Sequence, residues 1–227
     1  MRPGVAPVPA TPPATLPEAP RDCRLCPRLA AYRDATAAAE PDWFNGAVPS
    51  FGDPAAQLLV VGLAPGVRGA NRTGRPFTGD FAGDLLYATL HRHGFANGAF
   101  AARPDDGLRL MDCLVTNAVR CVPPLNKPTG AEIAACRSFL AARIAATPRL
   151  RAVVALGRIA HDSVLRALGA RPAQAPFAHG AEAQVGALTL FSSYHCSRYN
   201  TNTRRLTPEM FDAVFAAVRR HMDALTG

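Results

Sequence analysis

The sequence predicts an α/β fold: a three-layer α/β/α sandwich with a central, mainly parallel, four-stranded sheet. Four short apolar runs have the length of buried strands, and helical segments separate them. The runs lack clean alternation of apolar and polar residues, as expected of strands that are covered on both faces. Strands that alternate with helices favour a parallel sheet, whose ligand site lies at the carboxyl ends of the strands.

The chain begins with a segment rich in proline and alanine. Its first 20 residues contain seven prolines and one arginine, with no apolar stretch of the signal-peptide kind. We therefore expect residues 1–21 to form a disordered leader and residues 22–227 to form a single domain. A chain of 227 residues is long enough to bury a full core in one domain.

The expected elements follow one another along this domain. The strands are expected at Gln57–Leu63, Cys113–Val119, Arg151–Leu156 and Leu188–Ser193. The helices are expected at residues 24–38, Phe81–Gly94, Ala131–Ala146, Arg158–Leu168 and Pro208–Leu225. Two helix starts are well marked, because Thr129 and Glu132 form a capping box and Thr207 precedes a proline at the first helical position.

The chain is basic, with a formal net charge of +8 carried by arginine and a single lysine. Arginine suits forked contacts with phosphate, but a basic composition alone is weak evidence for nucleic acid. No apolar run approaches the length of a membrane span, so we expect no membrane partner. Six cysteines without an export signal indicate a reducing cytoplasm, where cysteine clusters are more often metal sites than disulfides.

Four of the cysteines have the spacing of a metal site. Cys23 and Cys26 form a C-x2-C pair near the start, and Cys121 and Cys136 form a second pair in mid-chain. Together they would complete a four-thiolate shell, which can hold either zinc or an iron–sulfur cluster. Four unrelated buried thiols are the alternative, because a lone C-x2-C pair is common.

Unusual residues gather where the predicted strands end. The first strand leads into a glycine-rich segment, residues 62–80, with three arginines before Phe77. The second strand ends near Asn117, and the fourth leads into residues 194–207. The glycine spacing does not fit the dinucleotide fingerprint, so the first segment alone indicates only a phosphate or base cradle.

Three motifs, taken with the four cysteines, resemble those of family 5 uracil-DNA glycosylases, iron–sulfur members of the uracil-DNA glycosylase superfamily. The motifs are Gly-Leu-Ala-Pro-Gly leading to Thr-Gly-Arg-Pro-Phe-Thr-Gly-Asp, Thr-Asn-Ala-Val-Arg-Cys, and His-Cys-Ser-Arg-Tyr-Asn-Thr. The resemblance extends from about Cys23 to the final helix. It implies a monofunctional glycosylase that flips and hydrolytically excises uracil from DNA in base excision repair, with hypoxanthine or xanthine as further substrates, and we expect a monomer.

The resemblance also implies a cofactor. It favours a [4Fe–4S] cluster over zinc, held by Cys23, Cys26, Cys121 and Cys136. The cluster would have a structural role and would shape a DNA-facing loop between the third and fourth ligands. Lys127 in that loop could reach a phosphate.

Excision of uracil leaves an oxocarbenium-like sugar and a uracil anion, so a carboxylate and a hydrogen-bond donor are needed. Asp80 is the expected carboxylate. His195 matches the family's leaving-group histidine, Asn117 matches its base-reading asparagine, and Phe77 is the expected stacking platform for the flipped base. Leu63 stands where family 4 relatives carry an acidic residue, so the role of the carboxylate is expected to fall to Asp80.

Further residues are expected to line the base pocket or to contact DNA. The base-binding set is Gly62, Leu63, Ala64, Pro65, Gly66, Phe77, Asn117 and His195. The DNA-binding set is Arg68, Arg72, Arg75, Ser197, Arg198, Tyr199, Asn200, Arg204 and Arg205. Residues 198–200 are the expected wedge that fills the space left by the flipped nucleotide.

Each catalytic candidate also has an ordinary structural interpretation. Asp80 could cap the helix that follows it, and His195 could be a loop histidine bound to the backbone. Asn117 could be a turn residue and Phe77 a core aromatic. Two other functions stay open: a non-catalytic iron–sulfur nucleic-acid-binding module, and an α/β enzyme that binds nucleotide phosphates with the glycine-rich loop.

Overall fold

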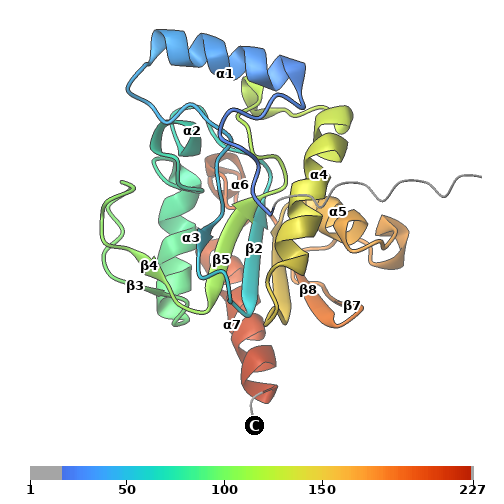
Figure 1. Ribbon diagram of the computed structural model, residues 1–227. Helices are drawn as coiled ribbons and strands as arrows, with labels where there is room; N and C mark the ends of the chain where they lie inside the picture. Colours follow the sequence, from blue (N-terminus) through green and yellow to red (C-terminus); the bar gives the residue numbers. More distant parts are fainter. Residues whose placement is uncertain (1–16, 226–227) are drawn as a thin grey trace, which may run out of the picture.

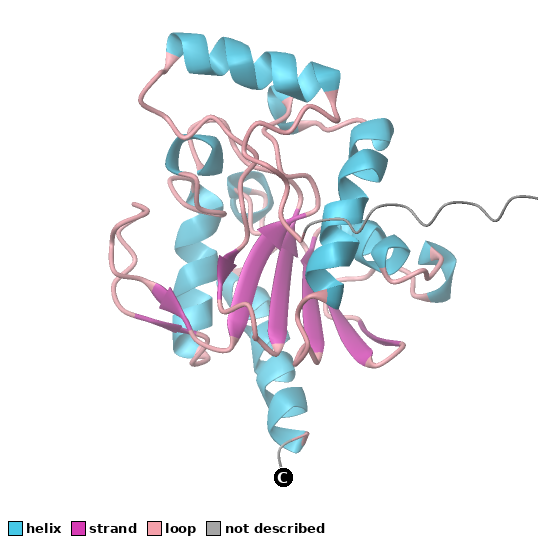
Figure 2. Cartoon of the chain, in the orientation of Figure 1, coloured by secondary structure: helices cyan, strands magenta, loops and turns pink. Residues whose placement is uncertain are grey.

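The computed structural model describes residues 17–225, in which a six-stranded sheet lies between two layers of helices (Figure 1, Figure 2). The strands of this sheet are β1 Phe51–Gly52, β2 Leu58–Gly62, β5 Cys113–Asn117, β6 Ala152–Leu156, β7 Glu182–Val185 and β8 Leu188–Ser193. Their order across the sheet is β1-β5-β2-β6-β8-β7. The four central strands are parallel, whereas β1 and β7 pair antiparallel at the edges.

The four predicted strands are therefore confirmed as the centre of the sheet, but the prediction of a four-stranded sheet is wrong. The two edge strands carry no apolar run. β1 has two residues, and β7 is a partly exposed Glu-Ala-Gln-Val segment. A small hairpin, β3 Ala96–Asn97 with β4 Arg109–Leu110, lies apart from the sheet.

All five predicted helices are present. They are α1 Pro27–Ala39, α3 Phe81–Arg92, α4 Gly130–Ala145, α5 Arg158–Ala167 and α7 Pro208–Ala224. Two short helices were not expected, α2 Ala70–Thr73 and α6 Arg198–Asn202. The 3₁₀ turns are Pro124–Asn126 and Pro172–Gln174. No helix in the described part of the chain is long and apolar enough to cross a membrane.

The side chains of the central strands alternate between two cores. Leu58 and Val60 of β2 point into a core shared with α3 and α7, whereas Leu59 and Val61 point into one shared with α4 and α5. Both faces of each central strand are thus buried, which explains the continuous apolar runs in the sequence. The parallel strands end at one edge of the sheet, and α1 lies above this edge (Figure 1).

Most of the expected leader, residues 1–16, lies outside the described residues. Residues 17–21, which we also assigned to the leader, pack against the domain. Glu18 pairs with the buried Arg120 at 3.1 Å and with Arg143 at 2.7 Å, and Ala19 is buried. These residues of the expected leader thus contact the domain, because a distant buried arginine binds Glu18.

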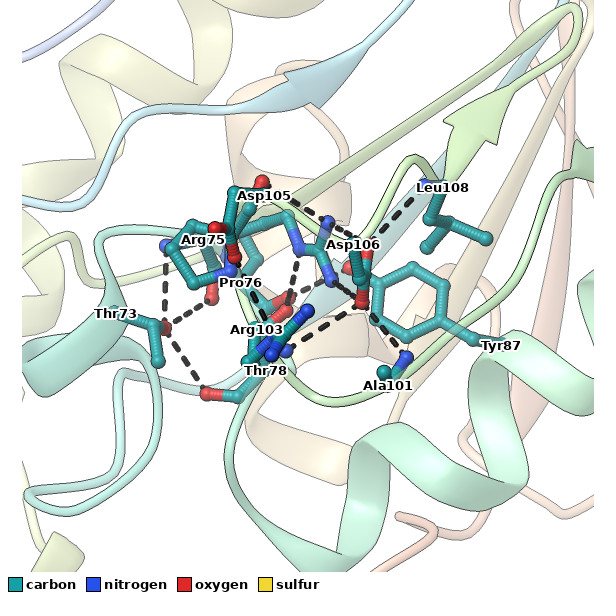
Figure 3. Close-up of polar contacts among 11 residues, drawn as sticks. Thr73, Arg75, Pro76, Thr78, Tyr87, Ala101, Arg103, Asp105, Asp106 and Leu108 are labelled. Atoms are coloured by element: carbon teal, nitrogen blue, oxygen red, sulfur yellow. Dashed lines mark hydrogen bonds and ion pairs between the residues drawn. The ribbon is translucent and has the colours of Figure 1, made fainter.

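Arg75, near the end of the glycine-rich segment, forms a buried ion pair (Figure 3). Arg75 donates from Nη1 and Nη2 to the two carboxylate oxygens of Asp106, at 2.9 and 2.8 Å. The two side chains are 5% and 0% exposed. The guanidinium also lies 5.0 Å from the ring centroid of Phe51 and 5.7 Å from those of Tyr87 and Phe100.

This pair, which we call the Arg75 clamp, fixes the turn that follows it. Arg75 Nε donates to Thr78 Oγ1 at 2.7 Å, and the hydroxyl of Tyr87 donates to the carbonyl of Pro76 at 2.6 Å (Figure 3). Thr73 Oγ1 donates to the carbonyl of Thr78 at 3.0 Å. The turn that carries Phe77 is thus bound to the core on both sides.

The clamp predicts a large loss of stability on removal of its carboxylate. Asp106→Ala should lower the free energy of unfolding by roughly 3–5 kcal/mol, because a guanidinium would then be buried without a partner. Urea denaturation measures this loss. The matched control is Asp105→Ala, whose partner Arg103 is exposed; a loss as large in that variant would contradict the assignment.

Candidate active site and thiol cluster

One pocket at the carboxyl edge of the sheet brings together the four residues expected to act on the base. We call it the inner pocket; it is lined by Ala64, Pro65, Gly66, Ala70, Phe77, Asp80, Ala82, Asn117 and His195. Beside it lies a wider hollow, the outer cleft, lined by Leu63, Ala64, Gly66, Asp80, Phe81, Ala82, Asn126, His195, Ser197 and Arg198. Three segments that are distant in the sequence therefore meet at one site.

Phe77 enters the inner pocket from a strained backbone. Its φ is +52°, in the left-handed region that bulky residues avoid, and its ring is buried. Two glycines make room for it. A Cβ at Gly62 would lie 2.4 Å from the Phe77 ring and 2.5 Å from Asn117 Oδ1, and a Cβ at Gly83 would lie 1.8 Å from the Phe77 carbonyl oxygen.

Asp80 uses its two carboxylate oxygens differently. Oδ1 accepts a hydrogen bond from the backbone N–H of Gly83 at 3.2 Å and so caps α3. Oδ2 faces the glycine-rich loop, where a Cβ at Gly69 would lie 2.5 Å from it and one at Gly66 3.4 Å. The capping interpretation is thus correct but incomplete, since one oxygen stays directed at the pocket. Burial raises the pKa of Asp80 above its usual value.

His195 lies two residues beyond the end of β8. Its ring is stacked at 25° to the ring of Phe77, with centroids 5.9 Å apart. Neither ring nitrogen has a hydrogen-bond partner among the described residues, so this is not a loop histidine bound to the backbone. Burial lowers the pKa of His195 to about 4, so the ring is neutral at pH 7 and one nitrogen carries a proton to donate.

Asn117 is the last residue of β5 and pairs in register with Gly62 of β2. Its side chain is 96% covered, yet its amide makes no hydrogen bond to any residue that the structure describes. A strand-end turn residue would use its amide on the neighbouring backbone. The amide instead offers a free donor and a free acceptor to the inner pocket.

The other expected base-binding residues divide between the two hollows. Ala64, Pro65 and Gly66 line the inner pocket, and Leu63 lines the outer cleft. Gly62 lies beneath the Phe77 ring. All members of the predicted set are thus close to the site.

The expected wedge is the short helix α6 and not a loop. Ser197 caps it and lines the outer cleft together with Arg198, whose guanidinium lies 5.3 Å from the ring centroid of Phe81. Asn200 donates to the carbonyl of His195 at 2.9 Å, so its amide supports the histidine. Tyr199 is 72% exposed and Arg198 is also exposed, so both side chains are accessible to a large partner.

The predicted arginines do not share one role. Arg68, Arg72, Arg204 and Arg205 are exposed. Arg75 is the exception: it is 4% exposed and paired with Asp106, so its assignment to DNA binding is wrong. A buried guanidinium that is already bound to a carboxylate cannot reach a phosphate.

Some residues at the site were not identified from the sequence. Asn126 lines the outer cleft, and Arg158 and Phe177 line a further hollow beside His195. Asp106, the partner of Arg75, stands in an ordinary polar loop. No motif marks these four, and only the fold places them near the site.

The four predicted ligand cysteines line one apolar pocket at the inner side of α1. Its lining residues are Ala19, Cys23, Leu25, Cys26, Leu29, Val119, Arg120, Cys121, Cys136 and Phe139. In the described part of the chain, no three His, Cys, Asp or Glu side chains are placed to hold a single metal ion. A shell of four cysteine thiolates is able to hold either zinc or an iron–sulfur cluster.

Two buried arginines face these thiols. Arg33, which is 2% exposed, donates from Nη1 to Cys121 Sγ at 3.4 Å and forms no ion pair with a carboxylate among the described residues. The backbone N–H of Arg120 donates to Cys136 Sγ at 3.2 Å, and its buried guanidinium is paired with Glu18. Burial of a cation beside neutral thiols is unfavourable, whereas deprotonated thiolates would compensate its charge. The cysteines thus fit an anionic, thiolate-bound centre.

Burial makes these thiols poor acids on their own. It raises the pKa of Cys121 to about 11 and that of Cys136 to about 12. A metal centre must therefore displace their protons when it binds, as thiolate-bound metals do.

Comparison with known proteins agrees with this geometry. The family model of the uracil DNA glycosylase superfamily matches residues 49–219. A protein of Thermus thermophilus named type-5 uracil-DNA glycosylase is 47% identical over 87% of this chain and 93% of its own length. Proteins of the same name from Mycobacterium tuberculosis and Pyrobaculum aerophilum are 42% and 41% identical, over 87% and 83% of this chain and 77% and 84% of their own lengths. On these matches and on the arrangement of its pocket, the chain belongs to the type-5 family of the uracil DNA glycosylase superfamily.

Proposed function

We propose that the protein is a monofunctional uracil-DNA glycosylase of base excision repair, which flips uracil out of DNA and hydrolyses its N-glycosidic bond. One observation carries this proposal: a carboxylate, an unpartnered amide and a neutral imidazole surround an inner pocket that has an aromatic ring as one wall. No lysine lines the pocket, which argues against a Schiff-base intermediate.

The inner pocket has the groups that a flipped uracil requires. Phe77 supplies a face for stacking. The amide of Asn117 accepts from the N3–H of uracil and donates to its O4, whereas cytosine presents the opposite pattern on that edge. Hypoxanthine and xanthine also present an N–H beside a carbonyl, so the same amide supports activity on these deaminated bases.

The chemical step divides between His195 and Asp80. As the bond from C1′ of the sugar to N1 of uracil breaks, its electron pair moves to the base and places negative charge on O2. The neutral ring of His195 donates a hydrogen bond to this oxygen, and Asp80 Oδ2 stabilises the sugar cation and orients a water. The water oxygen bonds to C1′ and passes its proton to the carboxylate, whose raised pKa makes it a stronger base.

We also propose that Cys23, Cys26, Cys121 and Cys136 hold a [4Fe–4S] cluster with a structural role. When bound, the cluster would supply a cross-link between the start of α1, the segment that begins at Cys121, and α4, which carries Cys136. It also supplies the negative charge that the buried Arg33 lacks. The 121–136 segment, which includes Lys127, would then be held in place beside the outer cleft.

The catalytic assignment predicts large losses of rate without loss of fold. Asp80→Asn and His195→Gln should each slow single-turnover release of uracil from duplex DNA by about 10²–10³, since each removes an interaction with developing charge. Asparagine still caps α3, so the first variant should keep its stability. The control is Asp84→Asn, an exposed carboxylate one turn along the same helix.

A near-normal rate in Asp80→Asn would mean that another group orients the water. Failure of the wild-type protein to release uracil, with DNA binding retained, would favour the non-catalytic binding module. Asn117→Ala should lower the preference for uracil over cytosine as well as the rate.

The pKa shifts predict the pH dependence of excision. The single-turnover rate should fall with decreasing pH as Asp80 is protonated, at a pH above the usual pKa of an aspartate. Burial lowers the pKa of His195 to about 4, so no step should occur near the usual histidine pKa of about 6.5. A step there that disappears in His195→Gln would contradict the neutral donor.

The cofactor assignment predicts roughly four iron atoms per chain and a brown colour after anaerobic purification. Cys136→Ala should lose the iron, whereas Cys113→Ala should retain it, because Cys113 lies in the core on the α3 side. Iron and zinc analysis of both variants tests this. Colourless protein with one zinc per chain would replace the cluster by a zinc site.

A further inference from the structure

One apolar side chain next to the outer cleft, that of Leu125, has no role in the proposed mechanism. Leu125 is 84% exposed, more than any other large hydrophobic residue in the described part of the chain. Its backbone is left-handed, with φ 55° and ψ 23°, a conformation that bulky residues avoid. Exposed apolar residues are common, but both features together cost free energy that no packing contact offsets.

The turn around Leu125 is held firmly. Pro123 and Pro124 precede the leucine, and their carbonyls accept from the backbone N–H groups of Asn126 at 3.2 Å and Lys127 at 3.1 Å. From α1, Arg28 Nη2 donates to the Lys127 carbonyl at 3.1 Å. These bonds keep the turn in a shape that presents Leu125 to solvent.

Arg28 also ties the turn to the helix that carries Cys136. Its guanidinium forms a second, forked contact with Glu132 of α4, at 2.8 and 2.7 Å. The turn lies between Cys121 and Cys136 in the sequence. The contacts of Arg28 attach it to α1, and Arg28 itself to α4.

The position of the turn points to a partner. Asn126, the next residue, lines the outer cleft with Asp80 and His195. Arg198 of α6 lines the same cleft, and the exposed Tyr199 follows it. Two separate segments of the outer cleft therefore each place an exposed, largely apolar side chain next to a lining residue. Leu125 is next to Asn126, and Tyr199 is next to Arg198.

We propose that Leu125 inserts into the DNA duplex beside the extruded nucleotide, as a second wedge in addition to Tyr199. This inference rests on the proposed function. An apolar side chain inserted between base steps offsets part of the unstacking cost of flipping and removes its own surface from water. The strained turn holds Leu125 in the exposed position that insertion requires.

The decisive variant is Leu125→Asn, because asparagine tolerates the left-handed conformation but cannot serve as an apolar wedge. The control is Met111→Asn, which removes an exposed apolar side chain just before β5, at the opposite end of the sheet. Both variants are used as holoprotein with their iron content measured. Thermal stability of Leu125→Asn should equal or exceed that of the wild type, since strain is removed.

Two readouts separate flipping from chemistry. Single-turnover uracil release should fall about tenfold or more on a duplex with a uracil–adenine pair, but stay within about twofold on single-stranded DNA, where no base pair must be broken. The fluorescence of 2-aminopurine next to the uracil should rise on binding of the wild type and rise less with Leu125→Asn. Met111→Asn should match the wild type in both.

Equal losses on duplex and single strand, or an unchanged duplex rate, would overturn the wedge. Failure of the proposed function has a different signature, because the wild type would then release no uracil from either substrate. The fluorescence change in unreacted duplex would still show whether Leu125 enters the stack.

Discussion

The forked ion pair between Arg75 and Asp106 is the interaction on which the geometry of the inner pocket depends. It lies among three aromatic rings and binds the turn on both sides of Phe77. Phe77 is thereby held in a backbone conformation that it would not adopt alone, and Asp80 follows at the start of α3. Desolvation makes the burial of an ion pair costly in free energy. The pair therefore contributes more by fixing the positions of Phe77 and Asp80 than by adding net stability.

The remaining catalytic groups are also prepared before any substrate binds. Asn117 ends β5 and His195 follows the end of β8, and the polar atoms of their side chains have no partner among the described residues. Groups that need no rearrangement as charge develops are the most effective in stabilising a transition state. The contacts of Arg28 with the Lys127 carbonyl and with Glu132 hold the turn that carries Leu125. The catalytic groups and the turn of Leu125 are thus both held in place by contacts with the rest of the domain.

Local sequence patterns predicted most of the fold, because apolar runs and helix caps are local signals. The edge strands were missed, since a two-residue strand and a partly exposed one have no apolar run. Single arginines were the hardest to assign. Arg75 and Arg198 look alike in sequence, but among the described residues Arg75 has a carboxylate partner, 31 residues away, and Arg198 has none. The motifs located the inner pocket because its residues follow strand ends, whereas Asn126 and the exposed Leu125 are placed by the fold alone.

A crystal structure of the Asp80→Asn protein with uracil-containing duplex DNA would test the central claim most directly. The uracil should lie flipped in the inner pocket, stacked on the ring of Phe77. The amide of Asn117 should bind its N3–H and O4, and a ring nitrogen of His195 should lie within hydrogen-bond distance of O2. A uracil bound elsewhere, or bound in this pocket with O2 turned away from His195, would contradict the account.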